Sequence, residues 1–209
     1  SRTIVHSNPG FPILLFEHFK KTDLKLYSWI HFEGRNSEET KQMIDMIRSY
    51  NRTSEKPIRI SVELEKLNKD LFTLAIRADV VFVSKDMAVF MNWGSAREAV
   101  FGLRTLITDL QSKESDNGLT WPLPSIICPW GSEGSDSLSG CDGTYTNLAA
   151  VQVDNVLDSL GAGDTFVAAV IFALNNLDKN LAEAVEYGNR LVAFKIQHRG
   201  YDCVEFFKI

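Results

Sequence analysis

Four short apolar runs predict buried β-strands. They are residues 26–32, 58–62, 80–83 and 126–128. Each run is rich in β-branched or aromatic side chains, as the strands of a parallel sheet covered on both faces are. Residues 144–153 alternate more weakly between apolar and polar side chains, and this segment predicts a hairpin or an edge strand.

Between these runs, apolar residues recur at three- and four-residue spacing, which is typical of helices packed on one side. One helix is predicted to open at Ser37, which we expect to be its N-cap, and a second follows Ser95 as its N-cap. Two more helices are predicted over residues 164–196, with a break at 175–180. The alternation of strands and helices predicts an α/β protein with right-handed crossovers.

Two polar segments predict loops. Residues 113–124 are interrupted by proline, and residues 131–143 are rich in glycine, serine and aspartate. The chain has 209 residues, which is enough for one large domain or two small ones.

Composition and charge narrow the functional classes. Hydrophobic residues make up 44% and charged residues 23%, so wholesale disorder is not expected. The formal charge of −5 argues against a protein that mainly wraps nucleic acid or binds acidic membrane. The apolar stretch at 166–174 is far too short to span a bilayer. Three sparse cysteines and no leader-like start predict reduced thiols and a cytoplasmic location.

The most informative stretch is residues 158–166, DSLGAGDTF. Gly161, Ala162 and Gly163 have little or no side chain, so their backbone can turn sharply and approach a ligand closely. An apolar helical run follows at once, and its N–H groups and positive dipole end would face the turn. This arrangement predicts an anion site.

Asp164 falls in the first turn of that predicted helix. A carboxylate there is placed to accept a proton from a hydroxyl that attacks a bound phosphoryl group. The alternative left open is that Asp164 only caps the helix and the glycines only form a tight turn. Phe166 occupies the third glycine position of a dinucleotide fingerprint, which disfavours that kind of site, and the chain has no Walker A loop.

Residues 158–171 resemble the C-terminal signature of the PfkB-type, ribokinase-like sugar kinases. Segments resembling the ketohexokinase branch of that family are residues 29–36, 61–66, 79–86 and 200–202. The resemblance implies a three-layer α/β/α fold with a mostly parallel central sheet. It also implies that residues 1–209 correspond to the C-terminal part of one such domain, without the family's N-terminal third and most of its β-lid.

The resemblance further implies ATP-dependent phosphorylation of D-fructose at its C1 hydroxyl, with Mg²⁺ and with K⁺ as a further candidate cofactor. Asp164 would be the catalytic base, and Gly161, Ala162 and Gly163 would form the anion hole. The residues implied for ATP binding are Arg2, Lys85, Gly131, Ser132, Glu133, Gly134, Phe166 and Asn189. Direct metal ligands are not assigned. The implied partners are ATP and a ketose, without nucleic acid or membrane, in a family that forms homodimers through the lid.

Most sugar-binding residues of the family lie in the part that has no counterpart here. We therefore expect the chain alone to hold the phosphate half of a site and, of the sugar contacts, only Asp164. Two alternatives stay open: another sugar or nucleoside kinase of the same family, or a non-catalytic nucleotide-binding protein. Among single residues, Glu63 is either a solvated acid or a water-mediated Mg²⁺ contact, Arg35 is either functional or part of a loop, and Cys128 is predicted to be a core thiol.

Overall fold

The computed structural model describes residues 14–114 and 121–207. Its centre is a six-stranded sheet in which the spatial order of the strands follows their order in the chain. The first four strands are parallel, and the last two run antiparallel to their neighbours. The strands are β1 (Trp29–Glu33), β2 (Arg59–Leu64), β3 (Val80–Val83), β4 (Ser125–Pro129), β5 (Ser135–Leu138) and β6 (Tyr145–Leu148).

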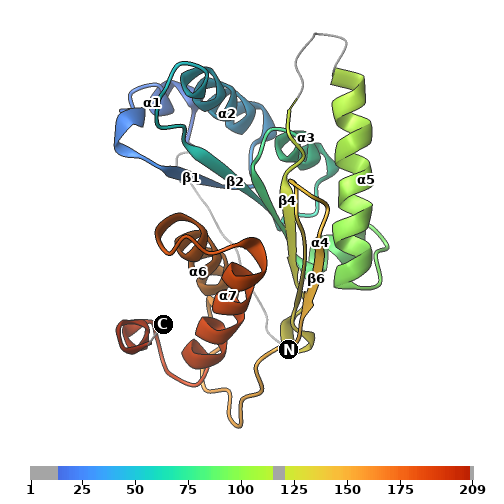
Figure 1. Ribbon diagram of the computed structural model, residues 1–209, viewed down its shortest axis with the longest axis vertical. Coiled ribbons are helices and arrows are strands. Elements are labelled where there is room, and N and C mark those ends of the chain that lie inside the picture. The colour runs from blue at the N-terminus through green and yellow to red at the C-terminus, as the bar shows by residue number, and fades with distance from the viewer. Residues whose placement is uncertain (1–13, 115–120, 208–209) are drawn as a thin grey trace, which may run out of the picture.

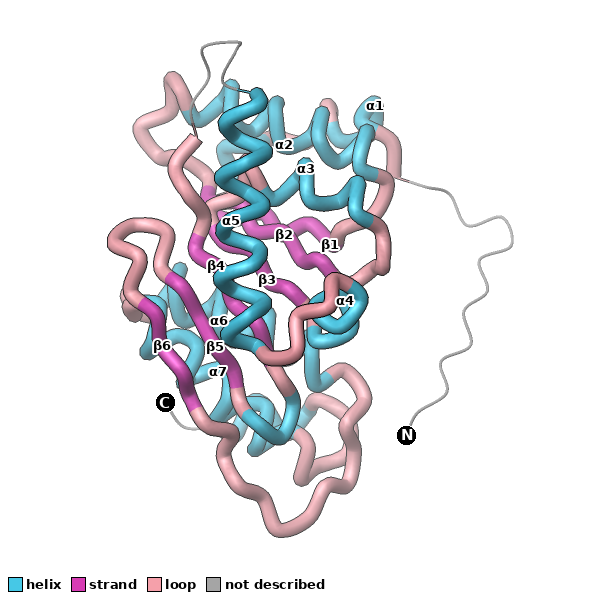
Figure 2. The backbone as a smooth tube through the Cα atoms, turned by 90° about the vertical axis from the view of Figure 1, so that its right-hand side faces the viewer, coloured by secondary structure: helices cyan, strands magenta, loops and turns pink. Residues whose placement is uncertain are grey.

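Helices cover both faces of this sheet (Figure 1). Figure 2 shows α5 in front of the strands, with α6 and α7 behind them. Alternate side chains of β3 serve the two faces: Val81 and Val83 join the core under α2, α3 and α5, whereas Val80 and Phe82 pack against α6 and α7. The three-layer α/β/α architecture is thereby confirmed. The helices are α1 (Phe16–Phe19), α2 (Ser37–Asn51), α3 (Phe72–Ala75), α4 (Lys85–Phe90), α5 (Ala96–Glu114), α6 (Ala162–Asn176) and α7 (Leu181–Lys195).

The apolar runs locate the parallel strands well. The strand predicted at 80–83 is confirmed residue for residue. The strand predicted at 126–128 is one residue longer at each end, and the one predicted at 58–62 begins one residue later and ends two residues later. The strand predicted at 26–32 begins only at Trp29, because the Asp23 side chain accepts a hydrogen bond from the N–H of Lys25 and starts a 3₁₀ turn.

Helix starts show how close the capping predictions come. The Ser95 hydroxyl accepts a hydrogen bond from the N–H of Glu98 at 3.1 Å, so the predicted N-cap of α5 is confirmed. The N-cap prediction for α2 is wrong by one residue. The N–H of Thr40 donates to the carbonyl of Asn36, which closes the first helical turn one residue earlier than Ser37 would.

The predicted loop over 131–143 is wrong in its middle, where β5 runs. All four residues of β5 are buried although three of them are polar. The Asp136 carboxylate accepts hydrogen bonds from the Tyr145 hydroxyl at 2.8 Å and from the Asn147 amide at 2.5 Å. β6 supplies both donors, which confirms the edge strand predicted within 144–153.

The other loop prediction needs a smaller correction. Residues 121–124 form a loop, but α5 continues to Glu114, into the segment predicted as loop from residue 113. The predicted break between the last two helices is confirmed, since α6 ends at Asn176 and α7 begins at Leu181. Over the described ranges, no helix is long and apolar enough to cross a membrane.

Candidate functional site

The glycine turn enters α6 through a left-handed residue. Gly161 has φ +67°, and its carbonyl accepts hydrogen bonds from both the N–H and the hydroxyl of Thr165, at 2.9 and 2.8 Å. The N–H of Ala162 donates to the carbonyl of Ser159 at 3.2 Å. Among the described residues, the N–H groups of Gly161 and Gly163 have no acceptor. The turn therefore offers two free donors where the sequence predicted three.

The two sides of this turn differ. A Cβ atom added to Gly163 would meet no heavy atom within 4 Å, so a ligand has room to approach there. A Cβ atom added to Gly161 would lie only 1.8 Å from the Tyr201 hydroxyl. The turn is thus covered by Tyr201 at Gly161 and open at Gly163.

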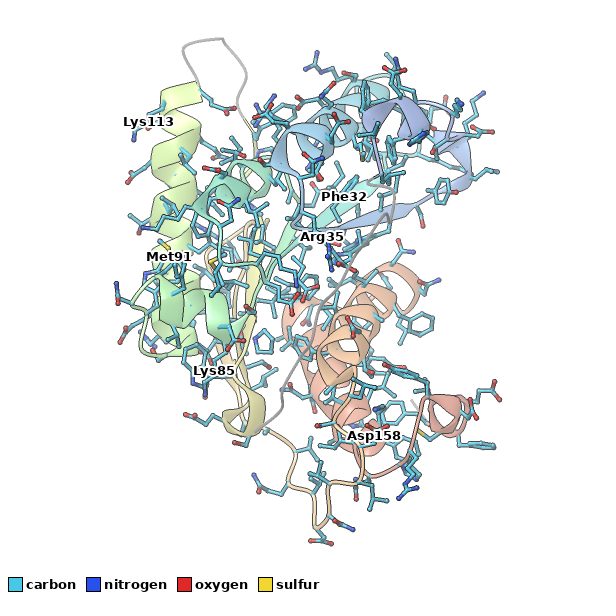
Figure 3. All side chains as sticks on the ribbon, turned by 180° about the vertical axis from the view of Figure 1, so that it is seen from behind. Phe32, Arg35, Lys85, Met91, Lys113 and Asp158 are labelled. Carbon is cyan, nitrogen blue, oxygen red and sulfur yellow. The ribbon has the colours of Figure 1, made fainter. Side chains whose placement is uncertain are left out.

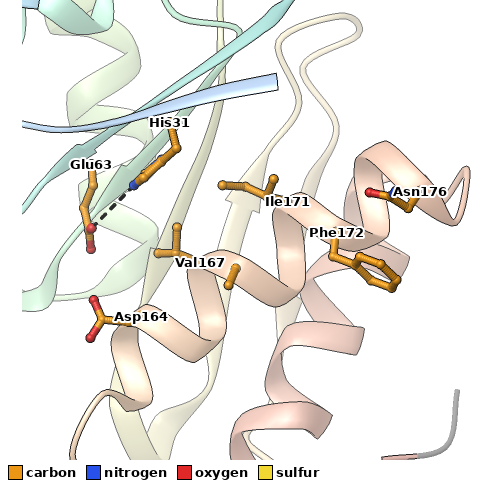
Figure 4. A pocket seen from close by; sticks show the side chains of 8 residues that line it. His31, Glu63, Asp164, Val167, Ile171, Phe172 and Asn176 are labelled. Carbon is orange, nitrogen blue, oxygen red and sulfur yellow. Dashed lines mark ion pairs between the residues drawn. The ribbon is translucent and has the colours of Figure 1, made fainter. Parts of the chain in front are cut away.

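Asp164 is the third residue of α6 and its side chain is exposed. Because Gly161 is the N-cap, the interpretation of Asp164 as the cap is wrong. Asp164 lines a cavity of about 440 Å³ together with Glu63 and His31 from the sheet (Figure 4). The apolar wall of that cavity comes from α6 and includes Val167 and Ile171.

The sheet side of the cavity is held by a small polar network. The Trp29 indole N–H donates to the Ser61 hydroxyl at 2.8 Å, and His31 Nδ1 lies 2.8 Å from the same oxygen. His31 Nε2 faces Glu63 Oε2 at 3.8 Å. These contacts hold His31 beside the Glu63 carboxylate, which lines the same cavity as Asp164 (Figure 4).

A second turn follows β4. Gly131–Glu133 form a 3₁₀ turn closed by a hydrogen bond from the N–H of Trp130 to the carbonyl of Gly134 at 2.7 Å. Gly131 and Gly134 both have positive φ, and Gly131, Ser132 and Glu133 are exposed. The short turn therefore presents backbone and small side chains to solvent.

The structure brings Lys85 to this second turn. Lys85 begins α4 directly after β3, and its Nζ lies 3.5 Å from Glu133 Oε1 and 4.8 Å from the centroid of the Trp130 ring. β3 and β4 are parallel neighbours, so their carboxyl ends meet at one edge of the sheet. In open α/β sheets this edge is where ligands bind.

Asn189 and Phe166 occupy different environments. Asn189 Oδ1 accepts a hydrogen bond from the Ser135 hydroxyl at 3.1 Å, while its buried Nδ2 finds no acceptor in the described part of the chain. Phe166 is only 4% exposed and packs against Gly188 of α7. The structure places Phe166 in the helix core rather than at the surface. Arg2 lies outside the described residues.

Two residues have plain structural roles. Burial is the main cause that raises the pKa of the Cys128 thiol to about 12, with the Asp136 charge adding to it, so the core thiol predicted from the sequence is confirmed. Arg35 pairs with Glu33 at 2.6 Å, and both side chains are about half exposed. Figure 3 shows Arg35 just beyond the end of β1.

Lys195 and Tyr201 are the residues of this site that the sequence did not reveal. Lys195 ends α7 and is fully buried, with its ammonium on the carbonyls of Asp158 and Leu160. A single lysine at the end of an amphipathic helix carries no signal of burial, because lysine usually keeps its head in water.

The sequence of this chain matches known proteins over the segments that form the site. The model of the pfkB family carbohydrate kinases matches residues 126–204, which include both turns, Asp164 and Lys195. Over 206 residues the chain is 37% identical to ketohexokinase of Mus musculus, which covers 98% of this chain. Residues 126–204 therefore carry the sequence pattern of the pfkB family. The chain spans 64% of that ketohexokinase, a little under two thirds of its length.

Solved structures support the same fold. The ribokinase of Giardia lamblia superposes with a TM-score of 0.65 at 14% identity, over 90% of this chain and 57% of that protein. The aminoimidazole riboside kinase of Salmonella enterica, solved with aminoimidazole riboside and an ATP analogue, gives 0.59 at 20% identity over 83% and 58%. This chain therefore has a ribokinase-like fold and spans a little over half of these two proteins.

Proposed function

We propose that this chain belongs to an ATP-dependent ketohexokinase that phosphorylates D-fructose at its C1 hydroxyl to give D-fructose 1-phosphate. The observation that carries the proposal is the exposed Asp164 carboxylate one residue beyond the open Gly163 position, at the N-terminus of α6. A base and an anion-binding backbone are the two elements that phosphoryl transfer to a hydroxyl requires. The likeness to mouse ketohexokinase supplies the substrate class.

In this proposal each group has one task. Asp164 takes the proton of the C1 hydroxyl as its oxygen bonds to the γ-phosphorus of ATP and the bond to the β–γ bridging oxygen breaks, releasing ADP. The N–H groups of Gly161 and Gly163, with the positive end of the α6 dipole, stabilise the charge on the transferred group. Ala162 contributes its small side chain rather than a donor, since its N–H is already bonded to Ser159.

The nucleotide would lie along the sheet edge between the two turns. Lys85 supplies positive charge beside residues 131–134, with Ser132 and Glu133 on the exposed rim. The unpartnered Nδ2 of Asn189 is a buried donor that a heterocyclic acceptor of the nucleotide would satisfy. Arg2 stays a prediction for the phosphates, and Phe166 would act only by supporting the helix pair.

Mg²⁺ fits as an ion bound with the ATP phosphates. No group of three metal-ligating side chains occurs within residues 14–114 and 121–207, but Glu63 faces the cavity beside Asp164. Mg²⁺ commonly takes one or two carboxylates together with substrate phosphates and water, so Glu63 would hold it through water. When bound, it neutralises phosphate charge. K⁺ dependence and a cytoplasmic location remain predictions.

A second candidate is nucleotide binding without sugar phosphorylation. The observation that favours the second candidate is the lining of the described cavity, where the groups positioned to contact a sugar are few and come mainly from Asp164, Glu63 and His31. A kinase of the same family that acts on another sugar or on a nucleoside is a further alternative. Ribose and adenosine, tested as substrates in the same assay, would distinguish it.

The test is ADP release by the purified 209-residue chain with saturating ATP and Mg²⁺, with and without D-fructose. If the proposal holds, fructose-dependent release falls by about 10²–10⁴-fold in Asp164→Asn, the usual contribution of a general base. ADP affinity, measured by calorimetry, should stay close to that of the unaltered chain. ADP binding without fructose-dependent release would instead establish the second candidate, and release that survives in Asp164→Asn would overturn the role of this carboxylate.

A further inference from the structure

We propose that Lys195 is a positioning residue, a built-in monovalent cation that aims the N–H of Gly161 at the phosphoryl site. This inference rests on the proposed function. It assigns to α7 a part in the site that neither the sequence motif nor the family match names. Lys195 touches no substrate in this proposal, and it acts only through the segment that precedes α6.

The surroundings of Lys195 form a complete oxygen cage. Its side chain is 0% exposed, and Nζ donates to the carbonyl of Leu160 at 2.5 Å and to the carbonyl of Asp158 at 3.1 Å. The same nitrogen lies 3.4 Å from Asp158 Oδ2 and 5.0 Å from the centroid of the Tyr201 ring. A buried ammonium is costly unless its donors are satisfied, and here the segment before the turn satisfies them.

Asp158 is itself held from both sides. Its carboxylate accepts hydrogen bonds from the N–H groups of Gly200 and Leu160, each at 3.0 Å, and these bonds hold the pKa of the carboxyl below its ordinary value. The carbonyl of Ile196, one residue after Lys195, accepts from the N–H groups of Leu157 and Asp158. The segment that leads into the anion turn is therefore fastened to the end of α7.

Peptide geometry links this cage to the anion site. In a trans peptide the C=O of one residue and the N–H of the next point in opposite directions. The Leu160 carbonyl points at Lys195 Nζ, so the N–H of Gly161 must point away from it. That N–H is one of the two backbone donors of residues 161–163 that have no acceptor among the described residues. Tyr201 covers the same glycine and leaves no room for another residue there.

The oxygen atoms around Lys195 Nζ indicate which ion could take the place of its ammonium group. Two carbonyls and a carboxylate are oxygen ligands of the kind that small cations take. Lys195→Ala would leave a space beside these oxygens in which an ammonium ion from solution fits, whereas Lys195→Met would fill most of the space with an uncharged chain. The two variants lose the same charge, but only one of them leaves room to restore it.

The experiment compares the affinity of the unaltered chain, Lys195→Ala and Lys195→Met for a non-hydrolysable ATP analogue, which keeps a γ-phosphoryl group, by calorimetry in sodium chloride and in ammonium chloride of equal ionic strength. We expect both variants to bind the analogue about tenfold more weakly in sodium, as losing a hydrogen bond from a charged group usually costs. Ammonium should restore most of the affinity of Lys195→Ala and little of that of Lys195→Met. If both variants lose affinity equally and ammonium restores neither, the lysine has a purely structural role. If the affinity of both variants is unchanged, the lysine has no role in binding. Either result overturns the proposal.

Hydrogen exchange separates this proposal from the proposed function. If the unaltered chain does not bind the analogue, the proposed function fails, and the positioning role is judged by exchange of the amides of residues 157–165. Those amides should exchange faster in Lys195→Ala and slow again in ammonium. Should that variant not fold, Asp158→Asn, which keeps the lysine and removes the carboxylate charge, is expected to speed the same amides. Unchanged exchange would contradict the proposal.

Discussion

At the scale of single residues, the glycines of the anion turn do different work. Gly161 is left-handed at φ +67° and lies against Tyr201, whereas Gly163 has an ordinary backbone conformation and faces open space. The left-handed region disfavours any residue with a Cβ, and a Cβ at Gly161 would also overlap the Tyr201 hydroxyl. The sequence motif contains both glycines and does not show that the fold requires a glycine at position 161, whereas at position 163 the space beside the backbone stays open.

We therefore predict opposite effects of two alanine substitutions. Gly161→Ala should lower the free energy of unfolding by about 1–3 kcal/mol, from the strained backbone and the overlap. Gly163→Ala should leave stability unchanged or slightly higher, because alanine favours a helix, but it should weaken binding of a non-hydrolysable ATP analogue that carries a γ-phosphoryl group. Urea unfolding and calorimetry with this analogue, on both variants, measure the two effects. A destabilised Gly163→Ala that still binds the analogue as the unaltered chain does would reverse the assignment.

At the scale of elements, a strand could be predicted from the sequence when its own residues stabilise it, and not when residues of another strand do. β3 is four apolar residues buried on both faces, so its own sequence specifies it. β5 has the sequence SDSL, and its burial depends on Tyr145 and Asn147 of β6, which bond to Asp136. The pattern of hydrophobic residues contains no information on these two hydrogen-bond donors. A polar strand such as β5 is therefore missed when strands are predicted from that pattern.

The packing of α6 on α7 gives a prediction at this scale. A Cβ atom at Gly188 would lie 2.8 Å from Val170 Cγ2 and 3.0 Å from the Phe166 ring. Gly188→Ala should therefore destabilise the protein by about 1–3 kcal/mol, as overpacking of a filled core does. Thermal and urea unfolding measure the cost.

A double substitution tests the cause of that cost. Val170→Ala removes the methyl group nearest to the new Cβ, so the double variant Gly188→Ala/Val170→Ala should lose less stability than the sum of the single variants. If the two losses simply add, close contact with Val170 is not the reason for the cost.

At the scale of the whole molecule, the site combines groups that are far apart in sequence. The two turns were predictable because each is a local run of residues, but the meeting of Lys85 with Trp130, of Glu63 with Asp164, and of Lys195 with Leu160 depends on the sheet order and on α7. The sequence predicted a layered α/β protein but not the order of the strands in the sheet. These pairings therefore became visible only in the structure.

The ends of the sheet give the molecular-scale prediction. Among the described strands, β1 pairs only with β2 and β6 only with β5, whereas β3 is paired on both sides. The amides of β1 and β6 should thus exchange with solvent faster than those of β3 in native-state hydrogen exchange. Protection of β1 equal to that of β3 would show that a further strand, from this chain or another, covers its edge.

The strand order has one more consequence, for the way in which the protein is made. Each strand of the sheet pairs with the strand next to it in the chain, so the sheet can grow strand by strand as synthesis proceeds from the N-terminus. The anion turn is different, because its entry segment is fastened by Lys195, Ile196 and Gly200, near the end of the chain. We expect a nascent chain on the ribosome to form the sheet before it can bind a phosphate group at the anion turn.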